Sequence, residues 1–211
     1  MTKSTPLNAN SDQSRDIKVL QFGGGNFMRA YLDWMVQRLN DDFEFAGGVA
    51  LVKPTGGPQY QDLEEQGGRY HVVTSGIKDK EVIQKIDLIT CIDQIYYPYD
   101  DFTAFIELAK QESILIITSN TTESGIVFAP GDTPDQTPPD SFPGKLCVFL
   151  RARYEFFAGA LDRGFFILPC ELIADNGKTL ETIVLKLAQT WYEDSAFNHW
   201  IKQANTFVNT L

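Results

Sequence analysis

Two kinds of hydrophobic pattern alternate along the 211-residue chain. Short continuous apolar runs are typical of buried parallel strands, and apolar positions about 3.6 residues apart indicate a helix packed on one face. Strand-like runs occupy residues 17–22, 47–52, 113–120 and 165–170, and helical patterns occupy residues 27–40, 100–111, 145–164, 180–187 and 194–207. This alternation predicts an α/β fold in which helices cover both faces of a mostly parallel sheet.

Three segments depart from the alternation. Residues 69–95 are rich in β-forming side chains, with a hairpin connection at 77–80, so we expect an antiparallel β insertion there. The proline-rich segment 129–144 cannot sustain a helix or strand and predicts a long surface loop. Residues 1–16 are polar and predict a disordered leader, which leaves 17–211 as one domain.

Composition narrows the function classes. A net charge of −10 with 18 lysines and arginines argues against binding to nucleic acid, and no apolar stretch reaches the roughly 20 residues that cross a bilayer. The leader has no apolar signal-peptide centre, so we expect a cytoplasmic protein. Three widely spaced cysteines and two isolated histidines indicate neither a disulfide framework nor a metal site. The sequence leaves the oligomeric state open.

The most informative stretch is KVLQFGGGNFMRAYLDWMV, residues 18–36, where a strand pattern ends on Gly23, Gly24 and Gly25 and a helical pattern follows. A dinucleotide site needs small residues here, because a side chain would keep the backbone away from the pyrophosphate. Met28 replaces the usual third glycine, and Lys53 stands where an acidic residue often follows the second strand. From these rules alone, an ordinary bend between strand and helix remains an alternative.

The segment GGGNFMRAYLDW resembles the Gly-x-Gly-x-Phe-x-Arg-Ala turn of the mannitol dehydrogenase family, the long-chain polyol and uronate dehydrogenases. That family does not use the third glycine. Four further segments agree over about residues 17–211, namely VKPTGG, TSNTTESGI, ILPCELIADNGKTL and ANTFVNTL. The resemblance implies a Rossmann-like domain that binds NAD, followed in the family by a helical domain. The family's catalytic lysine lies in that second domain and matches no position here.

The resemblance also implies which residues form the site. The expected cofactor-binding residues are Gly23, Gly24, Gly25, Asn26, Phe27, Arg29, Lys53, Asn120 and Thr121. Asn176 is the candidate catalytic residue, because an amide can donate to a developing alkoxide, although Asn-Gly also favours a turn or helix start. Asn120 and Thr121 could likewise serve only as turn residues. Lys53 could attract the 2′-phosphate of NADP, but it has no arginine beside it, so we expect a modest preference for NAD.

The quoted segments resemble the uronate-reducing members of the family more than the mannitol-oxidising ones. This implies hydride transfer that interconverts D-tagaturonate and D-altronate in hexuronate breakdown, with a small sugar acid as substrate. A mannitol or fructuronate dehydrogenase is the nearest alternative. A nucleotide-binding module without catalysis is an alternative of a different class.

Overall fold

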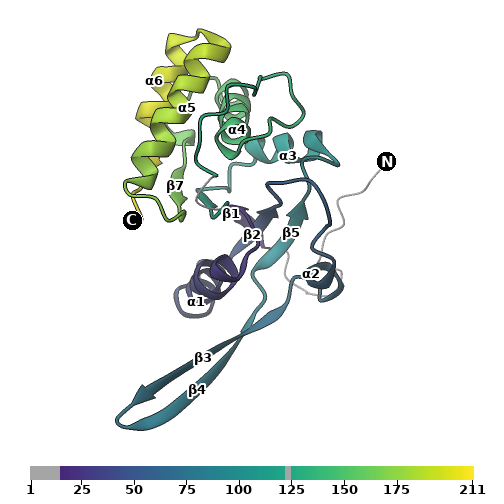
Figure 1. The fold of residues 1–211 in the computed structure, drawn as a ribbon, viewed down its shortest axis with the longest axis vertical. Helices are drawn as coiled ribbons and strands as arrows, with labels where there is room; N and C mark the ends of the chain where they lie inside the picture. The colour runs from purple at the N-terminus through teal and green to yellow at the C-terminus, as the bar shows by residue number, and fades with distance from the viewer. Residues whose placement is uncertain (1–14, 122–124) are drawn as a thin grey trace.

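A six-stranded parallel sheet forms the centre of the protein in a computed structural model that describes residues 15–121 and 125–211 (Figure 1). The strand order is β5-β2-β1-β6-β7-β8, and all five neighbouring pairs are parallel. The strands are β1 Asp16–Phe22, β2 Gly47–Val52, β5 Ile92–Tyr96, β6 Ile116–Ser119, β7 Phe166–Pro169 and β8 Thr206–Phe207. This is the strand order of the Rossmann fold, with the first strand at the point where the order reverses, so the predicted fold class is confirmed.

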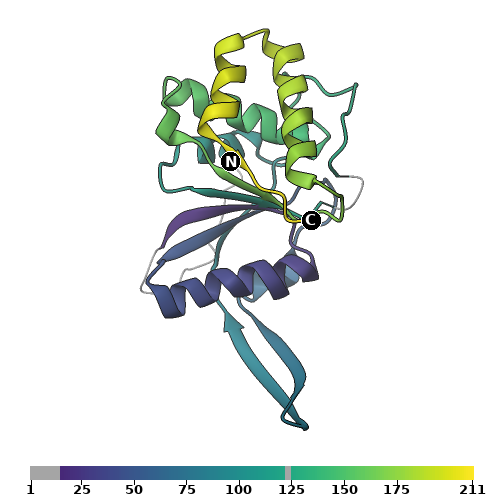
Figure 2. The ribbon, with the colours of Figure 1, turned by 90° about the vertical axis from the view of Figure 1, so that its left-hand side faces the viewer.

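Helices cover both faces of the sheet (Figure 2). One face carries α1, and the opposite face carries α4, α5 and α6. The helices are α1 Asp33–Phe43, α2 Gln61–Glu65, α3 Phe102–Glu107, α4 Phe142–Phe156, α5 Asn176–Tyr192 and α6 Ser195–Ala204; a π-helical turn η1, Met28–Leu32, precedes α1, and short 3-10 turns occupy Leu108–Lys110 and Leu161–Arg163. Leu20 and Phe22 of β1 join the larger core, and Val19 joins the core under α1, so alternate residues of β1 serve opposite faces.

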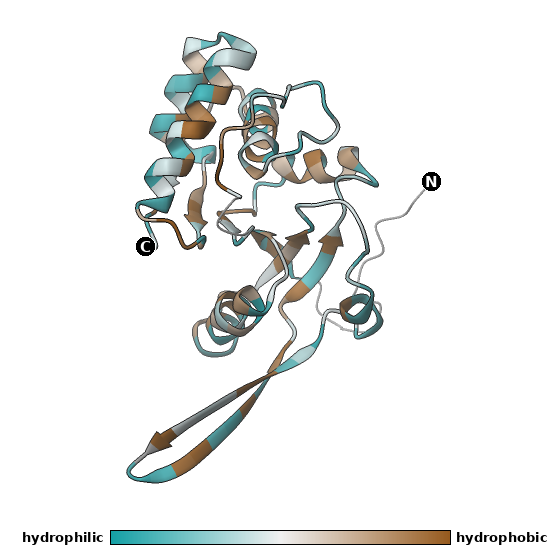
Figure 3. Ribbon diagram, viewed as in Figure 1, coloured by the Kyte–Doolittle hydropathy of each residue, from teal (hydrophilic) through white to brown (hydrophobic). Residues whose placement is uncertain are grey.

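The predicted antiparallel insertion is a hairpin that stands away from the body of the domain (Figure 1), but it is shorter than the predicted range 69–95, because Ile92–Tyr96 pairs with β2 as strand β5 of the parallel sheet. It consists of β3 Tyr70–Lys78 and β4 Glu81–Ile89, paired in continuous register. Asp79 and Lys80 form the two-residue turn, both with positive φ, which suits a hairpin of this length. Bands of apolar and polar residues follow one another along the hairpin (Figure 3), and several of the apolar residues are exposed. The predicted hairpin connection at 77–80 is therefore confirmed.

Two sequence-based boundaries near the end of the chain were wrong. The helix predicted to run to Gly164 ends at Phe156, because Ala158 and Gly159 both adopt positive φ, which breaks the helical path. The helix predicted over 194–207 stops at Ala204, and the next residues form the edge strand β8. The backbone N–H of Thr206 donates to the Phe165 carbonyl at 2.9 Å, so pairing with the sheet replaces helix continuation.

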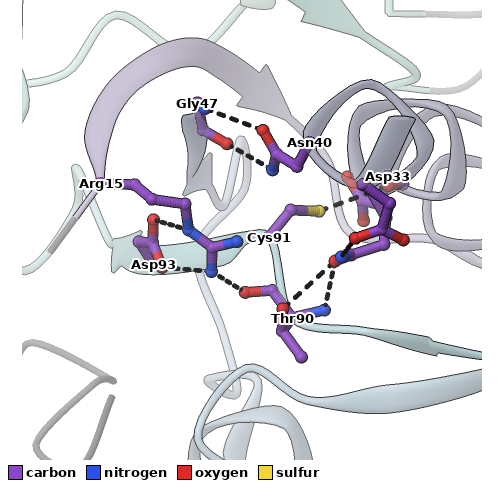
Figure 4. Close-up of polar contacts among 9 residues, drawn as sticks. Arg15, Asp33, Asn40, Gly47, Thr90, Cys91 and Asp93 are labelled. Atoms are coloured by element: carbon purple, nitrogen blue, oxygen red, sulfur yellow. Dashed lines mark hydrogen bonds and ion pairs between the residues drawn. The ribbon is translucent and has the colours of Figure 1, made fainter. Parts of the chain in front are cut away.

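The N-terminal boundary also needs correction. Residues 1–14 of the expected leader lie outside the described residues, but Asp16 begins β1. Arg15 forms a salt bridge to Asp93 at 3.1 Å and donates to the Thr90 carbonyl (Figure 4). The folded domain therefore includes residues 15 and 16. Within the described residues, none of the helices combines the length and the apolar character needed to cross a bilayer.

The proline-rich segment is irregular over most of its length, as predicted, but its C-terminal end is fixed to the domain. Asp132 is buried and accepts hydrogen bonds from the backbone N–H groups of Asp140 and Ser141, both at 3.0 Å. The Ser141 hydroxyl accepts from the Gly144 N–H at 3.0 Å and caps α4. Helix α4 therefore begins at Phe142, inside the segment expected to be a loop.

Candidate functional site

The candidate site lies where the carboxyl ends of β1, β2 and β6 meet. The backbone N–H of Gly23 donates to the Val52 carbonyl at 3.0 Å, which joins the end of β1 to the end of β2. The N–H of Asn120 donates to the Phe22 carbonyl at 3.0 Å, which joins the residue after β6 to β1. In open α/β sheets a ligand crevice forms at this reversal of strand order.

The three consecutive glycines meet different surroundings. Gly23 has φ +102°, and a Cβ atom there would lie 2.7 Å from the Asn120 carbonyl oxygen. A Cβ atom on Gly24 would lie 3.1 Å from the Tyr60 ring. A Cβ atom on Gly25 would have no heavy atom within 4 Å. Gly23 and Gly24 are therefore explained by packing, whereas Gly25 keeps the backbone open toward solvent.

The helix that follows the glycines presents free backbone donors. The Arg29 N–H donates to the Gly25 carbonyl at 3.1 Å, which makes Gly25 the residue before the first helical turn. The N–H groups of Asn26, Phe27 and Met28 lie in that first turn, where an α-helix offers no acceptor of its own. Such donors and the positive end of the helix dipole attract an anion.

A π-helical turn places Arg29 beside this helix start. The Asp33 N–H donates to the Met28 carbonyl, five residues back, and the Arg29 carbonyl instead accepts the Tyr70 hydroxyl at 3.0 Å. The Arg29 guanidinium carbon lies 6.0 Å from the Tyr70 ring centroid. Its Nε is buried without a hydrogen-bond partner among the described residues. The turn therefore holds a cation with unused donor capacity.

Buried Glu171 fixes the segment that follows β6. Its carboxylate accepts from the Ser119 hydroxyl at 3.0 Å and from the N–H and hydroxyl of Thr121 at 3.0 and 2.9 Å. The Asn120 side-chain amide donates to the Cys170 carbonyl at 2.8 Å. Asn120 and Thr121 are thus brought next to the glycine turn, as predicted, by contacts from the end of β7. Residues 122–124 of the TSNTTESGI segment lie outside the described residues.

Lys53 lies at the same edge of the sheet, but its ammonium group is occupied. Its Nζ donates to the Thr55 carbonyl at 2.6 Å, the Thr55 hydroxyl at 3.2 Å and the Gly56 carbonyl at 2.5 Å. Lys53 is 8% exposed. An ammonium group has three hydrogens, and each has an acceptor here. The arrangement makes Lys53 a clamp for the loop after β2.

Asn176 is the first residue of α5 and is fully buried. Its amide nitrogen donates to the carbonyls of Pro169 and Glu171, both at 3.0 Å, and to the Thr210 hydroxyl at 2.8 Å. Its amide oxygen accepts from the N–H groups of Gly177 and Thr210 at 2.8 and 3.0 Å. The nitrogen and the oxygen of the Asn176 amide are therefore both hydrogen-bonded within the protein. This geometry favours a role in starting helix α5 over a role as hydrogen-bond donor to a substrate.

Comparison with known proteins decides the family. Residues 17–211 match the family model described as the mannitol dehydrogenase Rossmann domain. The chain belongs to the mannitol dehydrogenase family. It is 42% identical over 194 residues to an altronate oxidoreductase of Bacillus subtilis (strain 168), and 40% identical over 195 residues to one of Klebsiella pneumoniae (strain 342). Each alignment covers 92% of this chain and 40% of the relative, so the chain spans about two fifths of the length of these relatives.

Two solved dehydrogenase structures share the fold. Pseudomonas fluorescens mannitol 2-dehydrogenase, solved as a ternary complex with NAD and D-mannitol, superimposes with a TM-score of 0.73 at 18% identity. That match covers 97% of this chain and 42% of the enzyme. A D-sorbitol dehydrogenase in substrate-free form gives a TM-score of 0.74 at 19% identity, covering 92% of this chain and 41% of the other.

Sequence reasoning missed four residues that shape this mannitol dehydrogenase-type site. Tyr60 accepts the Gly24 N–H at 3.1 Å, Glu171 holds the segment after β6, and Tyr70 contacts Asp33 and the π-helical turn. Asp33 and Glu171 lie within two of the five segments that carried the family resemblance, which was the available signal. Tyr60 and Tyr70 come from other parts of the chain, and no local pattern connects them to the glycines. Among the described residues there is no cluster of three or more His, Cys, Asp or Glu side chains suited to a metal ion.

Proposed function

We propose that this chain is the NAD-binding domain of an oxidoreductase that interconverts D-tagaturonate and D-altronate by hydride transfer. The observation that carries the proposal is the open backbone at Gly25, which lies directly before a helix start and beside the unpaired Nε of Arg29. A pyrophosphate needs close approach to the backbone together with several N–H donors. Both requirements are met at this turn.

The residues of the chain suit a nicotinamide dinucleotide. When bound, the cofactor supplies the hydride, and the protein binds and orients it. The first turn of the helix and Arg29 would hold the pyrophosphate. Asn120 and Thr121, fixed through Glu171 and Cys170, would line the crevice on the other side of β1. NAD is the expected form of the cofactor, because the ammonium group of Lys53 is already paired within its own loop.

The substrate assignment rests on the relatives. The relatives at 42% and 40% identity are altronate oxidoreductases, and the neighbour bound to D-mannitol is 18% identical. A small sugar acid is therefore the proposed substrate. We place the activity in the cytoplasm, because the three cysteines are unpaired. A catalytic role for Asn176 stays a prediction.

Two measurements test the proposal. Calorimetric titration of the 211-residue chain with NADH should show one binding site, and the same chain should not oxidise NADH in the presence of tagaturonate. Failure to bind NADH would refute the cofactor assignment. The natural polypeptide that carries these residues should oxidise NADH faster with tagaturonate than with fructuronate or fructose. A higher kcat/KM with either competitor would replace the proposed substrate, and binding without turnover on any of the three would favour a non-catalytic module.

A further inference from the structure

A buried polar cluster lies behind the glycine turn, between β1, the start of α1 and the base of the hairpin. Gln21 and Asp33 are both 0% exposed. Gln21 shares a face of β1 with Val19, which belongs to the apolar core under α1. Burying a polar side chain in such a place costs free energy unless its atoms find partners. The position therefore calls for an explanation other than core packing.

The cluster connects three parts of the cofactor site. The Tyr70 hydroxyl contacts the Asp33 carboxylate at 2.8 Å and the Arg29 carbonyl at 3.0 Å. The Gln21 amide donates to the Gly23 carbonyl at 3.2 Å and lies 3.5 Å from the same Asp33 oxygen. One buried acidic group is thus linked to the glycine turn through Gln21, and to the π-helical turn through Tyr70.

Three atoms of the cluster have no hydrogen-bond partner among the described residues: Gln21 Oε1, Asp33 Oδ1 and Arg29 Nε. If Asp33 is ionised, two of these atoms are acceptors and only Arg29 Nε is a donor; a proton on the Asp33 carboxyl group supplies a second donor. Burial raises the pKa of Asp33 to about 7, against the opposing effects of the Tyr70 and Gln21 hydrogen bonds and the Arg29 charge. Asp33 therefore changes its protonation near neutral pH.

We propose that Asp33 is a positioning residue for the cofactor: it holds the glycine and π-helical turns through Gln21 and Tyr70, and its proton controls how much of the Arg29 charge acts on the dinucleotide. This inference rests on the proposed function. An ionised Asp33 attracts Arg29 and repels the pyrophosphate, with little water between them to screen the charges. Protonation removes both effects, so the chain should bind NADH more tightly when Asp33 is neutral.

Four titratable groups around Asp33 have pKa values that burial or hydrogen bonding shifts away from neutral pH. Cys91 donates its Sγ–H to the Asp33 backbone carbonyl at 3.3 Å (Figure 4), and burial raises its pKa well above the usual value. Burial also raises the pKa of Tyr70 and of Tyr60. On β4, Asp87 pairs with Lys85 and accepts from Trp34 on α1, and the Lys85 contact lowers its pKa. Arg15 and Asp93 lie beyond Cys91 as an ion pair.

The test is the dissociation constant for NADH, measured from about pH 6 to pH 8.5 for the parent chain and for Asp33→Asn. The parent should lose affinity about tenfold as pH rises, the equivalent of roughly 1.4 kcal/mol. Asp33→Asn should show no such loss and should bind at the alkaline end at least as tightly as the parent. His71→Gln is the control, because it replaces an exposed side chain on the hairpin next to Tyr70 and leaves the contacts of Asp33 in place; it should keep the parent's profile.

Tyr70→Phe provides a second test that keeps the ring and its packing. The Tyr70 hydrogen bond lowers the pKa of Asp33, so its loss should move the midpoint of the NADH profile to higher pH. If Asp33→Asn keeps the parent's pH profile, or weakens binding by one factor at every pH, Asp33 is only structural and the inference is wrong. The proposed function would survive that result. Absence of NADH binding by the parent at every pH would instead refute the proposed function.

Discussion

The amino and carboxyl ends of the parallel strands form two opposite sides of the sheet, here called the amino edge and the carboxyl edge. They differ in how completely their polar groups are paired. At the amino edge Arg15 pairs with Asp93, and Asn40 makes two hydrogen bonds to Gly47 at 2.8 and 2.9 Å (Figure 4). At the carboxyl edge, the turn from β1 into α1 and the cluster behind it contain three of the four buried side-chain atoms that lack a partner in the described part of the chain. The amino edge is complete by itself, whereas the carboxyl edge has capacity for a ligand.

This comparison gives a criterion for function: a residue at the carboxyl edge acts on the cofactor if its own polar groups, or its backbone, remain free. Four variants test the criterion, in order of decreasing expected effect.

Gly25→Val should have the largest effect on binding. The added side chain would stand in the open space where the pyrophosphate needs the backbone, so NADH affinity should fall at least about 100-fold. The thermal midpoint should change little, because no heavy atom lies within 4 Å of the new Cβ and φ is not positive. Calorimetric titration and thermal unfolding measure the two effects separately.

Gly76→Val is the matched control. Gly76 lies on the hairpin, and a Cβ atom there would also have no heavy atom within 4 Å and no positive φ to strain it. The variant should bind NADH like the parent. If Gly25→Val retained the parent's affinity, the glycine turn would be only a bend, and the difference between the two edges would have no functional meaning.

Arg29→Gln should weaken NADH binding by about 10- to 100-fold, the usual value of one charge-assisted hydrogen bond. The NADH affinity of this variant should also depend less steeply on salt concentration, because one cation no longer faces the pyrophosphate. Arg38→Gln is the control on α1, the helix that directly follows: Arg38 pairs with Asp42 four residues away, and its loss should leave binding unchanged. Equal effects of the two variants would show that Arg29 contributes only to the general charge of the surface.

Gly23→Ala should destabilise the fold by about 2 kcal/mol, because the residue has φ +102° and the new methyl group would press on the Asn120 carbonyl. Denaturant unfolding measures this cost. The same contact connects β1 to the segment after β6, so NADH binding should weaken as well. A variant of unchanged stability would mean that the turn relaxes freely, and that Gly23 is not the joint between the two segments.

The sequence predicted those features that depend on local pattern. The boundaries of β2 at 47–52 and the hairpin connection near residue 78 were correct, because apolar runs and turn residues there agree with the tertiary structure. The end of α4 was missed because the sequence offers two glycines as helix ends: the chain leaves the helix at Gly159, whose N–H donates to the Tyr154 carbonyl, and not at Gly164. Strand β8 was missed because its two residues continue a helical pattern and become a strand only by pairing with β7.

The candidate site was predictable to a similar degree. Its glycines, Arg29 and Asn120 lie in recognisable segments, and the structure brings these segments together. The contacts that fix them come from distant parts of the chain: Tyr70 is 41 residues from Arg29, and Glu171 is 50 residues from Thr121. Such pairings follow from the topology and leave no periodic signal in one sequence. For the same reason, the internal pairing of Lys53 could not be distinguished from an exposed cation.

Lys53→Met should have the smallest effect, and it tests the criterion most directly. Lys53 lies at the carboxyl edge beside the end of β2, where a free cation would attract the 2′-phosphate of NADPH. Its ammonium group instead holds the carbonyls of Thr55 and Gly56. By the criterion drawn from the two edges, a paired cation should not act on the cofactor. The affinities for NADH and NADPH, and therefore their ratio, should change by less than about threefold, under 0.7 kcal/mol.

Parallel titrations of the parent and Lys53→Met with NADH and NADPH measure that ratio. A parent that prefers NADPH, and loses the preference in Lys53→Met, would show that the ammonium group leaves its loop to bind phosphate. Pairing in the free protein would then be a poor guide to function at this edge. The result expected instead is an unchanged ratio of NADH to NADPH affinity, with a small loss of stability in the variant because the loop after β2 is no longer held. That result would show that the criterion also holds for paired groups, which do not act on the cofactor. Lys53 would then belong with Arg15 and Asn40 as a residue that holds the fold.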